Sequence, residues 1–174
     1  MTLPREGRRE GGVHLYPVHV YYEDTDAGGV VYYANYLKFA ERGRSEAIRA
    51  LGAPPHDRLR EETGVTLAVH KLAAEYLSPA RLDDDLVVRT RVKSVSGASV
   101  SLEQEIWRDA TRLFAMSCTV VCIGRNGRPA RLPPVLAQAL ANTDPATLRP
   151  APRLANSSPK TPPKTSKAMK AHAR

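Results

Sequence analysis

The chain has 174 residues, of which 42% are hydrophobic and 6% aromatic, and its formal net charge is +8. This size suits one modest hydrophobic core, so the composition predicts a single globular domain rather than two. No apolar run reaches the roughly 20 residues of a membrane-spanning helix, and residues 1–12 lack the apolar segment of a secretory signal, so we expect a cytoplasmic protein.

The positive charge is concentrated at the C-terminal end of the chain. Residues 143–174 hold seven basic residues against one acidic residue, together with six of the fourteen prolines. The sequence therefore predicts a flexible N-terminus at 1–12, a folded domain at 13–142 and a disordered basic tail at 143–174. A solvated tail explains the charge more simply than a nucleic-acid partner does.

The first predicted elements are a strand and a long helix. Residues 13–22 are rich in Val and Tyr, which favours a strand, and Pro17 indicates an edge position or an early bend. Over 34–51 apolar side chains recur at helical spacing, and Gly52 with the prolines after it ends the helix. Gly43 costs this helix about 1 kcal/mol relative to alanine, which indicates a close approach by a neighbouring element.

After a polar loop, the pattern predicts four strands, at 65–77, 86–95, 100–107 and 112–123, and then a short helix from Pro133 to about Leu140. The second and third strands form a hairpin around Gly97. Its register pairs apolar residues on one face and opposite charges on the other: Val92 with Leu102, Val88 with Ile106, Arg91 with Glu103, and Arg89 with Glu105.

The order of these elements predicts the fold class. One strand, one helix and four strands exclude a doubly wound nucleotide-binding fold and favour an α+β fold, with an antiparallel sheet wrapped around one long helix. Cys118 and Cys122 are four residues apart in one strand, about 13 Å, which is too far for a disulfide. We expect both thiols to be free and buried.

The segment 21–36 carries the main functional signal. An apolar strand runs into an acidic turn, two glycines let the backbone bend, and the long helix then begins. This order places a carboxylate beside a helix N-terminus, whose unpaired N–H groups carry about half a positive charge. A carboxylate that attacks or deprotonates, next to donors for an oxyanion, suits acyl transfer.

Three stretches carry a resemblance to a known family. They are Tyr22-Glu23-Asp24-Thr25-Asp26-Ala27-Gly28-Gly29-Val30-Val31-Tyr32, then Ala34-Asn35-Tyr36, and Tyr76-Leu77-Ser78-Pro79-Ala80-Arg81-Leu82-Asp83-Asp84. Over 18–140 the chain resembles the hotdog-fold acyl-CoA thioesterases of the 4-hydroxybenzoyl-CoA thioesterase type, and most of all their bacterial branch associated with the Tol–Pal gene cluster. The resemblance implies a hotdog fold, hydrolysis of an acyl-CoA to free acid and CoA, and homodimers or homotetramers with active sites between subunits.

The resemblance also assigns roles to single positions. Asp26 matches the catalytic carboxylate, which acts as a nucleophile or as a general base, and the backbone N–H of Tyr33 matches the donor that faces the thioester carbonyl. Members of the closest branch often carry His at position 33, so this tyrosine departs from their pattern. The candidate substrate-binding residues are Thr25, Gly28, Gly29, Val30 and Lys71.

These residues also have structural interpretations. Asp26 and Thr25 suit a turn or a cap, the two glycines suit a tight turn without a ligand, and Asp24 suits bonding to the loop's own N–H groups. The acidic run 83–85 lacks histidine, so a solvated turn explains it better than a metal site. No phosphate-binding loop or zinc-ligand spacing is present in the sequence, and we predict no metal and no cofactor.

Two rival functions follow from the same sequence. A non-catalytic hotdog module would bind acyl carrier protein or a lipid-synthesis partner, and a nucleic-acid adaptor would bind through the basic tail. The acyl group is not fixed by the sequence, because short aliphatic chains and hydroxybenzoyl groups both agree with the resemblance.

Overall fold

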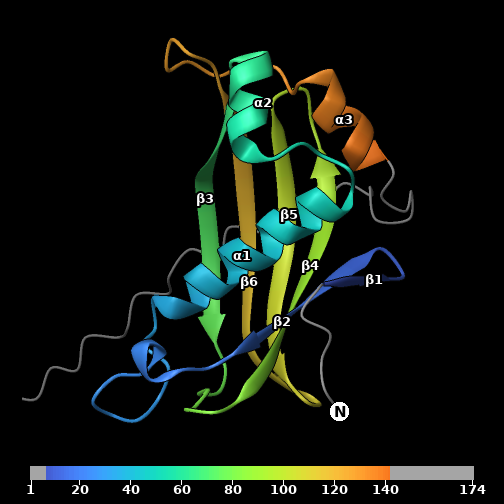
Figure 1. The fold of residues 1–174 in the computed structure, drawn as a ribbon. Coiled ribbons are helices and arrows are strands. Elements are labelled where there is room, and N and C mark those ends of the chain that lie inside the picture. The colour runs from blue at the N-terminus through green and yellow to red at the C-terminus, as the bar shows by residue number, and fades with distance from the viewer. Residues whose placement is uncertain (1–6, 142–174) are drawn as a thin grey trace, which may run out of the picture.

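The fold, seen in a computed structural model that describes residues 7–141, is one antiparallel sheet with helices around it (Figure 1). In chain order the elements are β1 Arg8–Glu10, β2 Val13–His19, the 3-10 helix η1 Tyr22–Asp24, α1 Asn35–Ala50, α2 His56–Thr63, β3 Thr66–Tyr76, β4 Asp85–Val95, β5 Ser99–Arg108, β6 Thr111–Ile123 and α3 Pro134–Ala141. The strand order is β1-β2-β4-β5-β6-β3. The structure confirms the predicted sheet wrapped around one long helix.

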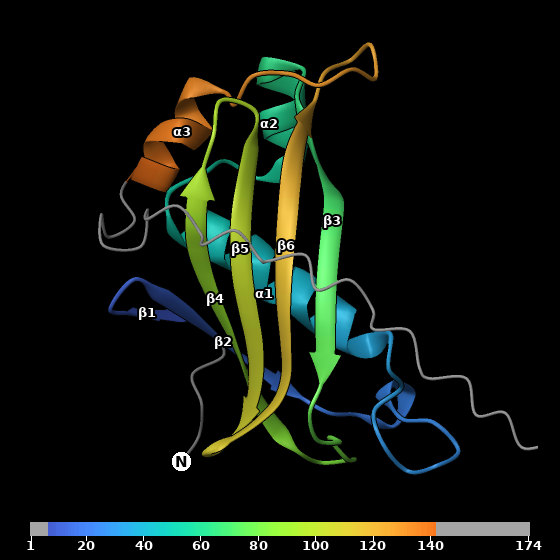
Figure 2. The same ribbon diagram turned by 180° about the vertical axis from the view of Figure 1, so that it is seen from behind.

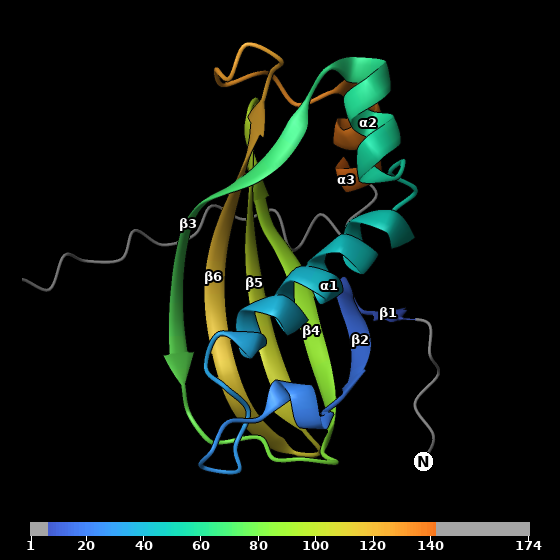
Figure 3. The same ribbon diagram turned by 60° about the vertical axis from the view of Figure 1, so that its left-hand side comes forward.

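Helix α1 crosses one face of the curved sheet, and its apolar stripe forms the centre of the core (Figure 3). Phe39 and Ala40 are fully buried there. A Cβ atom at Gly43 would lie 2.6 Å from Cγ1 of Val88 on β4. The missing side chain therefore lets α1 approach the sheet closely, as the cost of a glycine within the helix indicates.

The hairpin of β4 and β5 has the predicted register, with Val88 opposite Ile106 and Arg89 opposite Glu105. The apolar face is buried, but the ion pairs on the other face differ from the prediction. Lys93 contacts Glu103 at 3.0 Å and Arg112 contacts Glu105 at 2.8 Å, while the Arg89 guanidinium lies 4.5 Å from the centre of the Trp107 ring. Long side chains reach diagonal neighbours as well as opposite ones, so the register does not determine the ion pairs.

Two elements differ from the sequence prediction. Residues 56–63, expected as a polar loop, form α2, in which Leu59 is the buried residue. One buried side chain leaves no apolar stripe to detect. Arg8–Glu10, within the segment expected to be flexible, form the charged strand β1 and pair with β2. The three residues of this strand carry no pattern that predicts which strand they pair with.

Three further predictions concern the two cysteines, Pro17 and the C-terminal tail. Cys118 and Cys122 are free and buried, as expected, and burial raises the pKa of both thiols. Pro17 pairs with β4 on one side of β2, beyond the reach of β1 on the other side, which agrees with an edge position. Residues 143–174 lie outside the described part of the chain, so their disorder stays a prediction.

The two sheet faces are covered differently. Seen from behind, strands β4, β5 and β6 lie in front of α1, and no helix of residues 7–141 covers this second face (Figure 2). Helices α2 and α3 lie together at the end of the sheet away from η1. In the same described range, no helix has both the length and the apolar character needed to cross a membrane.

Candidate active site

Asp26 begins the tight turn between η1 and α1. Its Oδ1 accepts the N–H of Gly28 at 2.8 Å, its carbonyl accepts the N–H of Gly29 at 3.0 Å, and its own N–H bonds to the carbonyl of Val30 at 2.9 Å. Gly29 has a φ of 71°, which favours glycine. Asp26 is exposed, and its Oδ2 has no hydrogen-bond partner within the described residues.

Asp24 is the carboxylate that the fold buries, at 6% exposure. Its Oδ2 accepts the N–H of Tyr21 at 3.0 Å, as the expected bonding to the loop's own N–H groups requires. Its carbonyl accepts hydrogen bonds from the Nδ2 of Asn35 and the N–H of Tyr32. Asp24 thus links the acidic turn to the start of α1, and Asp26 is the more accessible carboxylate of the two.

Tyr33 lies two residues before α1, whose N-cap residue is Ala34, so it precedes the helix that it was expected to open. Helix boundaries vary by one or two residues, and Tyr33 still lies at the positive end of α1. Its carbonyl accepts a hydrogen bond from the hydroxyl of Tyr76 at 3.1 Å. The N–H of Tyr33 donates no backbone hydrogen bond among residues 7–141 and is therefore free to meet a ligand oxygen.

The side chains of two candidate substrate-binding residues are bonded or directed elsewhere. The hydroxyl of Thr25 donates to the carbonyl of Tyr22 at 3.0 Å, which is the capping alternative. Lys71 lies on β3 next to Leu72, which faces α1, and successive residues of a strand point to opposite faces. The structure therefore groups Gly28, Gly29 and Val30 with Asp26, whereas Lys71 points away from the α1 side.

A groove of about 440 Å³, here called the α1–β3 groove, lies between α1, β3 and β6. Its apolar lining comes from Leu37, Val69, Leu72, Met116 and Cys118. Leu37 is one helical turn beyond Tyr33, and Leu72 is on the same face of β3 as Tyr76, which contacts Tyr33. The groove therefore begins close to the free Tyr33 N–H, although Asp26 does not line it.

Arg44 contributes a positive charge to the lining of this groove. It was not identified from the sequence, because this arginine lies among other polar residues of α1. Its NH1 group donates to Oε1 of Gln104 at 3.0 Å. Gln104 is fully buried and donates in turn to the carbonyl of Ala40 and the hydroxyl of Thr90. This network fixes α1 on the sheet beneath the groove. A second cavity, of about 300 Å³ and lined mainly by charged side chains of the sheet, includes none of the candidate residues.

The segment 78–84 packs against the acidic turn. The N–H of Val31 donates to the carbonyl of Ala80 at 2.8 Å, and the N–H of Ala80 donates to the hydroxyl of Tyr36. Burial raises the pKa of Tyr36, so this hydroxyl stays protonated at neutral pH. The segment therefore holds both the turn and helix α1.

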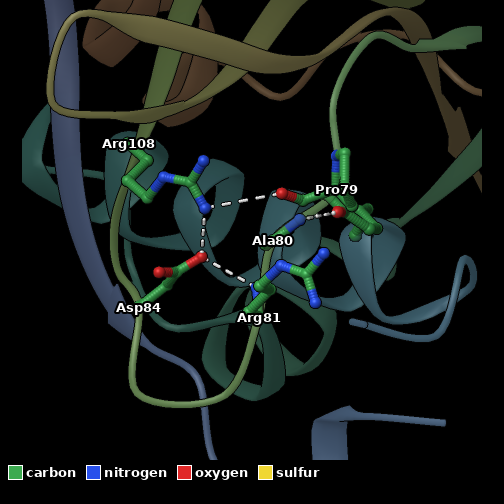
Figure 4. A network of polar contacts seen from close by, with 6 residues as sticks. Pro79, Ala80, Arg81, Asp84 and Arg108 are labelled. Carbon is green, nitrogen blue, oxygen red and sulfur yellow. Dashed lines mark hydrogen bonds and ion pairs between the residues drawn. The ribbon is translucent and has the colours of Figure 1, made fainter. Parts of the chain in front are cut away.

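The acidic run 83–85 is only partly the solvated turn that we expected. Asp83 and Asp85 are exposed, but Oδ2 of Asp84 accepts the NH1 group of Arg108 at 2.6 Å and the N–H of Arg81 at 2.8 Å (Figure 4). An arginine 24 residues away gives no local signal of this contact. The described residues include no group of His, Cys, Asp or Glu that could hold a metal ion.

Comparison with known proteins agrees with this geometry. A model of the thioesterase superfamily matches residues 28–115. The acyl-CoA thioesterase YbgC of Haemophilus influenzae is 45% identical over 108 residues, which are 62% of this chain and 79% of that protein. A crystal structure of a probable thioesterase from Bartonella henselae is 34% identical, with a TM-score of 0.65, and the match covers 70% of this chain and 99% of that one.

A structure of a 4-hydroxybenzoyl-CoA thioesterase in complex with 4-hydroxybenzoyl-CoA has a TM-score of 0.69 at 18% identity, covering 74% of this chain and 98% of that one. At this identity the likeness concerns the fold alone. The superfamily model spans half of the chain, and the proteins from Haemophilus influenzae and Bartonella henselae are 45% and 34% identical to it. The chain belongs to the thioesterase superfamily and has its hotdog fold, which confirms the resemblance seen in the sequence.

Proposed function

We propose that this protein hydrolyses the thioester of an acyl-CoA, releasing the free acid and CoA. The observation that carries the proposal is the 45% identity over 108 residues to an acyl-CoA thioesterase. The free N–H of Tyr33 near an accessible carboxylate supports it, because acyl transfer needs both an oxyanion donor and a nucleophile or base.

In the proposed mechanism the Tyr33 N–H binds the thioester carbonyl oxygen as it becomes negative. One such donor is typically worth about 3 to 4 kcal/mol of transition-state stabilisation. The Gly28 N–H holds Oδ1 of Asp26, and Oδ2 acts. It either attacks the carbonyl carbon to form an anhydride that water then cleaves, or it takes a proton from the attacking water. In both routes the C–S bond breaks and the thiolate of CoA leaves and is protonated.

The α1–β3 groove is the proposed acyl pocket. Its volume of about 440 Å³ lies within the usual range of ligand sites, about 300 to 1,000 Å³, and its apolar floor suits a short aliphatic or a hydroxybenzoyl group. Thr25, Gly28, Gly29 and Val30 would form the mouth through backbone and short side chains. Lys71 points away from the groove and is a candidate only for the CoA phosphates. No metal or cofactor is part of the proposal.

The active form is proposed to be a homodimer, or a homotetramer built from two dimers, with sites between subunits. Strand β3 ends the sheet and exposes Val69 and Leu72 at 46% and 44%. An unpaired edge strand with apolar side chains is a surface that another strand can join. Location in the cytoplasm and binding of acyl carrier protein belong to the same proposal.

The test is a panel of acyl-CoA thioesters, from acetyl to octanoyl and including 4-hydroxybenzoyl, with CoA release followed by a thiol reagent. We expect turnover of at least one thioester at a rate of about 1 per second or more, as for ordinary enzymes. Binding of acyl carrier protein without CoA release from any thioester would instead support the non-catalytic module and overturn the proposal.

A further inference from the structure

We propose that Asp84 and Arg108 are positioning residues for Asp26. Their ion pair fixes the segment 78–84, and this segment in turn fixes the acidic turn. The inference rests on the proposed function, because it presupposes that Asp26 acts on the thioester.

The ion pair is the firmest contact of the segment. Arg108 NH1 and Asp84 Oδ2 lie 2.6 Å apart, with the two side chains 31% and 19% exposed. The same Asp84 oxygen accepts the N–H of Arg81, and Arg108 also approaches the carbonyl of Pro79 at 3.5 Å (Figure 4). One guanidinium therefore holds both ends of the segment against the end of β5. Charge-assisted hydrogen bonds of this kind are about twice as strong as neutral ones.

The segment passes this restraint to the acidic turn through the backbone. Arg81 forms an antiparallel bridge with Val30, and the carbonyl of Ala80 accepts the N–H of Val31. Val30 accepts the N–H of Asp26 at 2.9 Å. The main-chain hydrogen bonds from Val31 to Ala80 and from Asp26 to Val30 thus connect the segment to Asp26.

The backbone of the segment turns sharply at Asp83. This residue has a φ of 65°, a left-handed conformation that glycine favours and that aspartate adopts more readily than most other residues. The hydrogen bond from the N–H of Asp83 to the carbonyl of Val20 and the ion pair of Asp84 hold the chain on either side of this position. Without the ion pair, the segment would relax and the turn with Asp26 would move with it.

A displaced Asp26 lowers turnover more than it lowers substrate binding. A shift of about 1 Å in a reacting group can cost about 100-fold in rate. The apolar lining of the acyl pocket comes from Leu37, Val69, Leu72, Met116 and Cys118, and neither Asp84 nor Arg108 belongs to it. Loss of the ion pair should therefore change kcat and leave KM nearly unchanged.

The experiment compares R108Q and D84N with R112Q on the best acyl-CoA of the panel. Arg112 and Glu105 form an ion pair of 2.8 Å on the outer face of the sheet, and neither side chain bonds to the segment within the described residues, so R112Q is the matched control. We expect R108Q and D84N to lower kcat about tenfold or more, with KM within about threefold, whereas R112Q keeps kcat within about twofold. Arg108→Lys keeps the cation and should restore most of the lost kcat. Thermal melts establish that the compared variants are folded.

The decisive step repeats R108Q in a D26N background. If Arg108 acts through Asp26, R108Q should slow D26N by less than about twofold, because coupled residues are not additive. If D26N is slow and R108Q lowers its kcat as much as it lowers that of the wild type, the inference is wrong but the proposed function stands. Equal kcat in R108Q and R112Q has the same consequence. Full activity of D26N by itself instead removes the proposed role of Asp26, and the inference falls with it.

Discussion

At the scale of single residues, the structure distinguishes Asp24 from Asp26, two acids of the same type that lie two positions apart in the sequence. Asp24 is the last residue of η1 and Asp26 follows it, but only Asp24 is buried and bonded to the start of α1. The resemblance selected Asp26, whereas the spacing alone favoured a turn or a cap. The resemblance also assigned the N–H of Tyr33, whereas the contact of Asp84 with Arg108 depends on tertiary structure, so no local pattern predicted it.

Another residue gives a prediction about pH and stability. His14 on β2 is 4% exposed, and its Nδ1 has no hydrogen-bond partner among the described residues. Burial lowers the pKa of His14 from the ordinary value of 6.5; nearby Glu46 opposes this shift and Arg9 adds to it. The folded protein therefore binds this proton less readily than the unfolded chain does.

The contribution of His14 to stability should be complete above about pH 7 and should be lost as the pH falls below about 6.5. The loss approaches 1.4 kcal/mol for each pH unit until the folded-state pKa is reached. Urea denaturation of the wild type and of His14→Leu between pH 7.5 and 5 measures it. The wild type should lose more stability than the variant on acidification, and parallel curves would contradict the assignment.

At the scale of elements, apolar periodicity predicted the helix and the strands whose side chains form the core. The helix α1, the three long strands of the β4–β6 meander and the register of Val88 with Ile106 all follow from side chains that alternate between the core and solvent. Elements with one buried residue or none, such as α2 and β1, give no such signal. The ion pairs on the outer face also escaped prediction, because flexible side chains choose among several neighbours.

At the scale of the whole molecule, the exposed edge of β3 is the surface on which we propose that subunits assemble. Its exposed apolar residues lie on the strand that borders the proposed acyl pocket. A second subunit that pairs with this edge would cover them and would also close the groove. Assembly and activity would then depend on the same surface.

The corresponding prediction concerns Leu72, which is 44% exposed on β3. Leu72→Lys places a charge on the proposed contact and should shift the protein from dimer or tetramer to monomer. Light scattering after size-exclusion chromatography measures the mass at matched concentrations. The control is Val135→Lys, since Val135 is an exposed apolar residue of α3 at 39% and lies away from this edge. A wild type that is already monomeric, or a variant with unchanged mass, would contradict the assembly.

The account depends above all on the carboxylate of Asp26, and its most direct test is the turnover of D26N on the best acyl-CoA thioester. Glu23 is a nearby exposed carboxylate, and Glu23→Gln is the matched control. We predict that D26N lowers kcat about 1,000-fold, as expected when a nucleophile or general base is removed, while Glu23→Gln stays within about threefold of the wild type. Turnover by D26N equal to that of the wild type would contradict the account.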